Sequence, residues 1–212
     1  MICVSLIKKS VSEVLTALKT LKLAEVRLET LPALTQDDVT AIFSCNAQIV
    51  ATCRPSGQSD AERAQVLRWA IEAGATYVDL EIESDSSFKS PLTQLAKEKG
   101  CQVIISYHNF EGTPDTEELC RIVETCFFHG ADIAKVACLV HTQAEAARII
   151  GLGDSERPVI PIGMGDAGRI ARVAAPFVGS PFTYASLNGE ETAPGQIDAK
   201  LLEKMYTWLK VM

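Results

Sequence analysis

Short apolar segments alternate with longer segments of helical periodicity from one end of the 212-residue chain to the other. The apolar segments are rich in Val, Ile, Leu and Ala, as in strands that are buried on both faces. Strands that alternate with helices form a parallel sheet with right-handed crossovers. Because eight such units are present and no GxGxxG motif follows the first strand, the pattern predicts a (β/α)8 TIM barrel rather than a doubly wound sheet. We expect one domain over residues 1–212.

The ends of the predicted elements follow from the limits of each periodic segment and from the residues beside them. We expect Ser59 or Asp60 to cap a helix that ends at Ala73, and Gly74 to follow it. The predicted strands are Ile2–Ile7, Glu25–Glu29, Ile49–Arg54, Tyr77–Ile82, Gln102–His108, Ile133–Cys138, Val159–Gly163 and Phe182–Ala185. The other predicted helices are Val11–Leu21, Gln36–Ser44, Ser87–Lys99, Asp115–His129, Thr142–Ile150, Ala167–Phe177 and Asp198–Met212.

Composition excludes several classes of function. The net charge of −7 and the pI of about 5.1 argue against a broad surface for nucleic acid or for anionic membranes. No segment approaches the roughly 20 apolar residues of a membrane span. The seven cysteines are scattered without a CxxC pair, so we expect free thiols in a reducing cytoplasm. The sequence offers no convincing set of metal ligands, and no metal site is predicted.

The predicted strand Ile133–Cys138 carries a lysine in the middle of an apolar run. Burial of Lys135 would disfavour its charged form, and a neutral amine is a nucleophile that can form a Schiff base with a substrate carbonyl. The alternative is that Lys135 lies at a strand end and extends its amine to solvent. This strand alone does not decide between the two, so the evidence comes from the other strands.

Polar residues gather late in the other predicted strands, where barrel enzymes place their catalytic groups. Glu25 and Arg27 are two residues apart and share one face of the second strand, Arg54 ends the third strand, and His108 ends the fifth. Histidine titrates at about pH 6.5 and can transfer protons in both directions, whereas the alternative is a core histidine bonded to a backbone carbonyl. With Lys135, these residues predict a site for a carbonyl compound that carries a carboxylate.

Two further features allow alternative interpretations. Asp79 and Glu81 share one face of the fourth strand and could either belong to the site or form ion pairs that seal the barrel mouth. The glycine-rich loop 163–168 could hold a phosphate, as loops after the seventh strand of a barrel often do. However, Asp166 would repel phosphate, and a tight turn before a helix is the favoured interpretation.

Six short motifs stand in the order and spacing of one known family. They are Val4-Ser5-Leu6, Glu25-Val26-Arg27, Ser106-Tyr107-His108-Asn109-Phe110, Ile133-Ala134-Lys135, Gly168-Arg169-Ile170-Ala171-Arg172 and Ala193-Pro194-Gly195-Gln196. They make essentially the whole chain similar to type I 3-dehydroquinate dehydratase, the shikimate-pathway enzyme that makes 3-dehydroshikimate. The resemblance implies a lyase of aromatic amino acid biosynthesis that acts on the small molecule 3-dehydroquinate and needs neither a metal nor an organic cofactor. It also implies a possible homodimer and a possible fusion with shikimate dehydrogenase.

By this resemblance, Lys135 forms a Schiff base with the C3 ketone of the substrate. His108 is implied to remove the C2 proton and to return a proton to the departing C1 hydroxyl. Arg172 is implied to hold the substrate carboxylate through paired hydrogen bonds, for which lysine would be a poor substitute. Thr192 stands in the lid loop where the family usually has serine. The resemblance implies substrate binding by Ser5, Glu25, Arg27, Arg54, Arg172, Thr192 and Gln196.

The chain departs from the family at Gln58, where a glutamate commonly orients the catalytic histidine. A neutral amide could still orient the ring but would stabilise an imidazolium less. The first strand starts at Ile2, so the N-terminal hairpin that closes the barrel floor in longer relatives is expected to be missing. Two other functions stay open: a class I Schiff-base aldolase that acts on a sugar phosphate, and a non-catalytic barrel domain of a fused enzyme.

Overall fold

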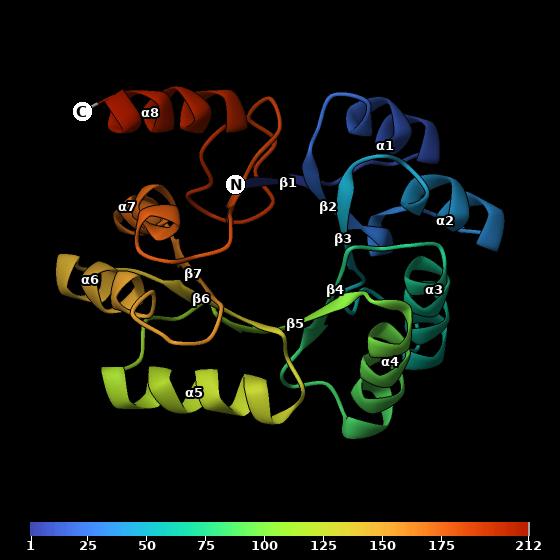
Figure 1. The fold of residues 1–212 in the computed structure, drawn as a ribbon, viewed down its shortest axis with the longest axis horizontal. Coiled ribbons are helices and arrows are strands. Elements are labelled where there is room, and N and C mark those ends of the chain that lie inside the picture. The colour runs from blue at the N-terminus through green and yellow to red at the C-terminus, as the bar shows by residue number, and fades with distance from the viewer. Residues whose placement is uncertain (212) are drawn as a thin grey trace.

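The computed structural model describes residues 1–211, which form a barrel of eight parallel strands surrounded by helices (Figure 1). Paired strands follow the order β7-β6-β5-β4-β3-β2-β1-β8. β7 and β8 lie side by side, but no ladder joins them in the described part of the chain, so side-chain packing closes the barrel there. The predicted TIM barrel is confirmed. The strands are β1 (Ile2–Leu6), β2 (Leu23–Arg27), β3 (Gln48–Thr52), β4 (Tyr77–Glu81), β5 (Gln102–Asn109), β6 (Ile133–Leu139), β7 (Val159–Met164) and β8 (Thr183–Ala185).

The strands alternate with α-helices that form the outer layer in Figure 1. The predicted helix Ala167–Phe177 is divided into η2 (Asp166–Gly168), α7 (Arg169–Ala174) and η3 (Ala175–Phe177). α7 ends before η3 because Pro176 lacks the amide hydrogen that would continue it. Met212, the predicted last residue of the final helix, lies outside the described residues. The other helices are α1 (Val11–Leu18), α2 (Gln36–Phe43), α3 (Asp60–Glu72), α4 (Ser86–Lys99), α5 (Thr116–Phe128), α6 (Gln143–Gly151) and α8 (Ala199–Val211).

Local signals in the sequence explain where the helices begin and end. Ser59, rather than Asp60, caps α3: its hydroxyl accepts a hydrogen bond from the backbone N–H of Glu62, whose carboxylate accepts one from the Ser59 backbone. Gly74 follows α3 with a φ of +100°, a conformation that favours glycine. The second strand is shifted from the predicted Glu25–Glu29 to Leu23–Arg27, because residues Leu28–Thr30 form the short helix η1.

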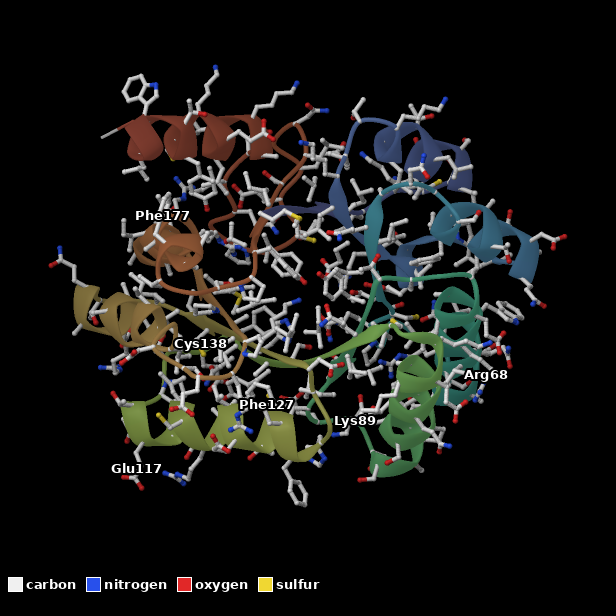
Figure 2. All side chains as sticks on the ribbon, in the orientation of Figure 1. Arg68, Lys89, Glu117, Phe127, Cys138 and Phe177 are labelled. Carbon is white, nitrogen blue, oxygen red and sulfur yellow. The ribbon has the colours of Figure 1, made fainter. Side chains whose placement is uncertain are left out.

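Side chains fill the barrel interior and the layer between strands and helices (Figure 2). Because side chains alternate along a strand, interior residues follow one another at intervals of two. The floor of the interior is apolar, whereas the layer above it is largely polar. The floor comprises Cys3, Leu23, Val50, Tyr77, Ile104, Ile133, Ile160 and Phe182. Two residues further along their strands lie the buried polar residues Ser5, Glu25, Thr52, Asp79, Ser106 and Lys135.

Within residues 1–211, no helix has the length and apolar character needed to cross a membrane.

Candidate active site

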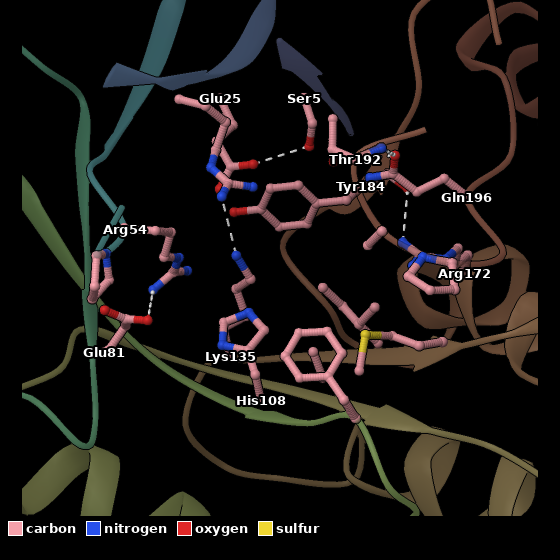
Figure 3. Close-up of a pocket in the computed structure, with 18 residues that line it drawn as sticks. Ser5, Glu25, Arg54, Glu81, His108, Lys135, Arg172, Tyr184, Thr192 and Gln196 are labelled. Carbon is pink, nitrogen blue, oxygen red and sulfur yellow. Dashed lines mark hydrogen bonds and ion pairs between the residues drawn. The ribbon is translucent and has the colours of Figure 1, made fainter. Parts of the chain in front are cut away.

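A cavity of about 470 Å³ opens at the carboxyl ends of the strands, directly above the buried polar layer (Figure 3). Every residue that the sequence assigned to the site lines this cavity, although these residues come from four strands, two loops and one helix. The structure therefore brings the predicted constellation together in one place. The lining residues are Ser5, Glu25, Arg27, Arg54, Pro55, Glu81, His108, Phe110, Lys135, Ala137, Ile162, Met164, Arg172, Tyr184, Thr192, Ala193, Pro194 and Gln196.

Lys135 lies at the bottom of the cavity on β6, with 4 % of its surface exposed, so it does not extend its amine to bulk solvent. Its Nζ lies 2.8 Å from Asp79 Oδ2 and 3.5 Å from Glu25 Oε1. The ring centre of Tyr184 lies 4.3 Å from the same nitrogen. The buried amine is thus surrounded by two carboxylates and an aromatic face.

Asp79 on β4 is the most highly connected acid of the site. It accepts hydrogen bonds from Arg54 Nη2 at 2.9 Å, Ser106 Oγ at 2.6 Å and Lys135 Nζ at 2.8 Å. Burial alone would raise the pKa of Asp79, but the nearby Arg54 and Lys135 hold it well below its usual value. Asp79 therefore stays a carboxylate beside the amine. Glu81, two residues on, instead pairs with Arg54 and Arg63 at the mouth of the barrel.

Glu25 on β2 is the second carboxylate beside Lys135. Its two oxygens accept hydrogen bonds from Ser5 Oγ and Thr52 Oγ1, each at 3.0 Å. Burial acts to raise the pKa of Glu25, whereas Lys135 and then Arg27 lower it, and the net shift is downward. Arg27 itself forms its ion pair with Glu29, at 2.6 Å, and leaves Glu25 to the lysine.

His108 on β5 lines the cavity near Lys135 (Figure 3). Its ring stacks on Phe110 with 6.1 Å between centres, and no residue among 1–211 forms a hydrogen bond with it. Burial lowers the pKa of His108 well below its usual value, and the positive charges of Arg54 and Lys135 add to this effect more than Asp79 opposes it. The imidazole is therefore neutral near pH 7, in the state that accepts a proton.

Gln58 does not point towards His108. Its side chain is exposed, accepts a hydrogen bond from Ser56 Oγ at 2.8 Å, and lines a separate surface groove beside Trp69. No side chain takes the place of the orienting glutamate in this structure, within the residues described. The ring is held by burial and by its contact with Phe110.

Arg172 on α7 is a buried cation with few partners, at 1 % exposure. Nη1 donates a long hydrogen bond of 3.4 Å to the backbone carbonyl of Tyr184, while Nε and Nη2 have no partner in the described chain. Burial lowers the pKa of Arg172 to about 10, partly opposed by Glu191. Unpaired buried donors on a charged group are costly, so this arrangement suits an anionic ligand that supplies the missing acceptors.

The loop after β8 covers one side of the cavity. Gln196 Oε1 accepts hydrogen bonds from the backbone N–H and the hydroxyl of Thr192, at 2.7 and 3.2 Å. Gly195 has a φ of +75°, and a Cβ at this position would lie 2.4 Å from the carbonyl oxygen of Gly165. The close approach of Gly195 to Gly165 therefore requires glycine and places Thr192 and Gln196 over the site.

The loop 163–168 is a tight turn. Gly163 and Gly168 pack so closely that a Cβ on either would lie 2.5 Å from the backbone of the other. Asp166 points outward and pairs with Arg169, at 3.1 Å, on the surface. The turn thus positions α7 and Arg172, and its geometry gives no support to a phosphate site for a sugar-phosphate aldolase.

The sequence interpretation left two interior residues outside the site. Asp79 was noted only as one of two strand-end acids, and Tyr184 was not identified at all. The two-residue period of β4 and β8 could have placed both in the barrel interior, on the face shared with Glu81 and Phe182. No group of three or more His, Cys, Asp or Glu residues within 1–211 is arranged to hold a metal ion.

Comparisons with known proteins identify the family of this chain. The family model described as type I 3-dehydroquinase matches residues 2–212. The 3-dehydroquinate dehydratase of Methanococcus maripaludis is 32 % identical over 214 residues, covering 97 % of this chain and 98 % of that protein. That of Methanocaldococcus jannaschii is 31 % identical over 221 residues, covering 97 % of both. The crystal structure of 3-dehydroquinate dehydratase from Geobacillus kaustophilus shares the fold, with a TM-score of 0.89, 23 % identity, and coverage of 99 % of this chain and 91 % of that one. This chain belongs to the type I 3-dehydroquinase family.

Proposed function

We propose that this protein removes water from 3-dehydroquinate to give 3-dehydroshikimate, through a Schiff base on Lys135 and acid–base catalysis by His108. One observation carries the proposal: a buried amine, a neutral imidazole and an arginine with unpaired donors line the same cavity. These groups match a substrate that has a ketone, an acidic C–H beside it and a carboxylate. Dehydration in the shikimate pathway is the reaction of the family to which the chain belongs.

The first stage is formation of the imine. Attack on the C3 ketone needs a free amine, so the ammonium held by Asp79 and Glu25 gives up a proton to water in the cavity before Nζ bonds to carbon. The hydroxyl of the resulting carbinolamine takes up a proton in turn and leaves as water, which gives an iminium ion. The iminium draws electrons from the neighbouring carbon and makes the C2 hydrogen acidic. The two carboxylates favour this positively charged intermediate, because they lie beside the nitrogen that carries its charge.

The second stage is elimination. His108, neutral because its pKa is lowered, takes the C2 proton. The electron pair of the broken C–H bond forms the new C=C bond, and the C1 hydroxyl leaves as water with a proton from the imidazolium. A water molecule then hydrolyses the imine, which frees Lys135. Imine formation and elimination each release one water and hydrolysis consumes one, so the net change is loss of one water.

Residues around the cavity are proposed to recognise the substrate. Arg172 has Nε and Nη2 unpaired, so a carboxylate that meets them would form two charge-assisted hydrogen bonds. We assign contacts with the ring hydroxyls and the approach to the ketone to the polar residues around Lys135 and to the lid loop. These residues are Ser5, Glu25, Arg27, Arg54, Thr192 and Gln196.

Trapping of the imine tests the proposal. The protein is mixed with 3-dehydroquinate and sodium borohydride, which reduces an imine to a stable secondary amine, and is then mapped by peptide mass spectrometry. We expect the adduct on Lys135. Lys89 is a matched internal control, because it is also buried but lies on α4 outside the cavity, and it stays unmodified. An adduct only on another lysine, or none at all, would show the mechanism to be wrong.

A further inference from the structure

The hydroxyl of Tyr184 is buried inside the active site and has no hydrogen-bond partner among residues 1–211. Tyr184 lies on β8, with 2 % of its surface exposed, and its ring lies against the Lys135 amine. In Figure 3 the hydroxyl end of the ring points towards Glu25 and Lys135, and away from Arg172. A buried hydroxyl without a partner is costly in the free protein, so its presence calls for an explanation.

The number of N–H donors on Lys135 changes during the proposed reaction. An ammonium group has three N–H donors, and here it serves Asp79 at 2.8 Å and Glu25 at 3.5 Å. An iminium nitrogen keeps only one N–H. Formation of the imine therefore leaves one of the two carboxylates without its charged donor.

Glu25 is the carboxylate with the weaker remaining support. Asp79 keeps hydrogen bonds from the charged Arg54 and from Ser106, whereas Glu25 keeps only those from two neutral hydroxyls. The unused O–H of Tyr184 is directed to the same place. Burial, followed by the negative charge of Glu25, raises the pKa of Tyr184 well above its usual value, so the phenol keeps the proton that it would donate.

We propose that Tyr184 is a positioning residue whose hydroxyl becomes a hydrogen-bond donor to Glu25 when the Lys135 amine has become an imine. This inference rests on the Schiff base proposed above. The Tyr184 hydroxyl thus supports the covalent intermediate and contributes nothing to the stability of the free protein. Tyr184→Phe keeps the ring against Lys135 and removes only the donor, so it isolates this role.

The test measures imine formation without turnover. In a His108→Ala background, the fraction of protein trapped by borohydride is recorded against the concentration of 3-dehydroquinate. Adding Tyr184→Phe is expected to raise the half-saturating concentration about tenfold, the effect of losing one hydrogen bond to a charged group. Without substrate, Tyr184→Phe is expected to unfold at the same temperature as the wild type or at a higher one. Tyr77→Phe is the matched control: it removes a hydroxyl from the floor of the same interior, outside the cavity, and leaves trapping unchanged.

The outcomes separate the two proposals. If the His108→Ala parent forms no adduct, the Schiff base itself is wrong, and the role of Tyr184 is overturned with it. If the parent is trapped and Tyr184→Phe matches it, only the role of Tyr184 is overturned. A clear loss of thermal stability in Tyr184→Phe would also overturn it, because the hydroxyl would then have a partner in the free protein.

Discussion

Lys135 and Arg172 are both buried cations that line one cavity, but they differ in whether the protein supplies partners for their charges. Lys135 lies between Asp79 and Glu25, two carboxylates that the fold itself supplies. Arg172 has one long hydrogen bond to a backbone carbonyl and two nitrogens without a partner in the described chain. The charge of Lys135, the proposed nucleophile, is thus balanced in the free protein. The charge of Arg172, the proposed binding residue for the substrate carboxylate, is balanced only when an anionic ligand binds. Replacement of each cation should therefore have opposite effects on stability.

The largest effect is expected from Lys135→Met. This change leaves Asp79 and Glu25 in the barrel interior with less positive charge beside them, so we expect a loss of about 3 kcal/mol in the free energy of unfolding. Activity should fall by roughly a thousandfold or more, because no other lysine within residues 1–211 lines the cavity. Urea unfolding and the rate of 3-dehydroshikimate formation measure the two effects.

A second substitution checks the cause of the lost stability. Adding Asp79→Asn to Lys135→Met removes one of the two carboxylates, so part of the lost stability should return while activity stays absent. If Lys135→Met unfolds at the same urea concentration as the wild type, the fold does not depend on the pairing of this charge, and the contrast with Arg172 is lost.

Arg172→Met is expected to weaken the substrate complex without weakening the fold. It removes a buried charge that has few partners, so the free energy of unfolding should stay the same or rise. KM should increase about a hundredfold, from the loss of paired charged hydrogen bonds to the carboxylate, with a smaller change in kcat. Arg172→Lys keeps a positive charge but lacks the planar guanidinium that forms paired hydrogen bonds. Its KM should therefore lie between those of the wild type and Arg172→Met. Steady-state kinetics and thermal unfolding test this, and an unchanged KM would count against the clamp.

The sequence predicts the strand-end residues of the site because a two-residue period fixes which side chains face the interior. Glu25 and Arg27 are an example, since both line the cavity as expected. The partners of Asp79 could not be predicted in the same way. Arg54, Ser106 and Lys135 come from a strand end and two other strands. The β4–β5 ladder places Ser106 opposite Glu81 and not opposite Asp79, so the stagger of the strands is what brings the Ser106 hydroxyl within 2.6 Å of Asp79.

Loop conformation is the other limit of prediction from sequence. Gln58 was expected beside His108 because of its spacing from Arg54, but the loop after β3 directs it into a groove outside the cavity. Neither period nor spacing determines where such a loop points, because its backbone follows no repeating hydrogen-bond pattern. The same applies to Arg172, whose position depends on the contact between Gly163 and Gly168.

The smallest expected effect concerns His108, whose pKa is lowered by burial and further by the cations Arg54 and Lys135. The neutral ring is the form that accepts the C2 proton, so protonation of His108 should lower kcat/KM as the pH drops through this lowered pKa. The acid limb that His108 causes is thus expected below about pH 6.5, the usual histidine value. An acid limb at or above that pH would show that the working enzyme stabilises the imidazolium of His108. That result would contradict the inference that the positive charges of Arg54 and Lys135 disfavour it.

Stability gives an independent measure of the same pKa. Below about pH 6.5 the histidine of the unfolded chain binds a proton that the folded protein does not, so the contribution of His108 to stability decreases as the pH falls. The decrease should be smaller in His108→Ala.

Gln58→Glu is the matched control for the activity profile: a carboxylate in the outer groove should leave the acid limb in place. If that limb moves to higher pH in Gln58→Glu, the loop after β3 reaches His108 during turnover, and residue 58 then acts on the imidazole after all.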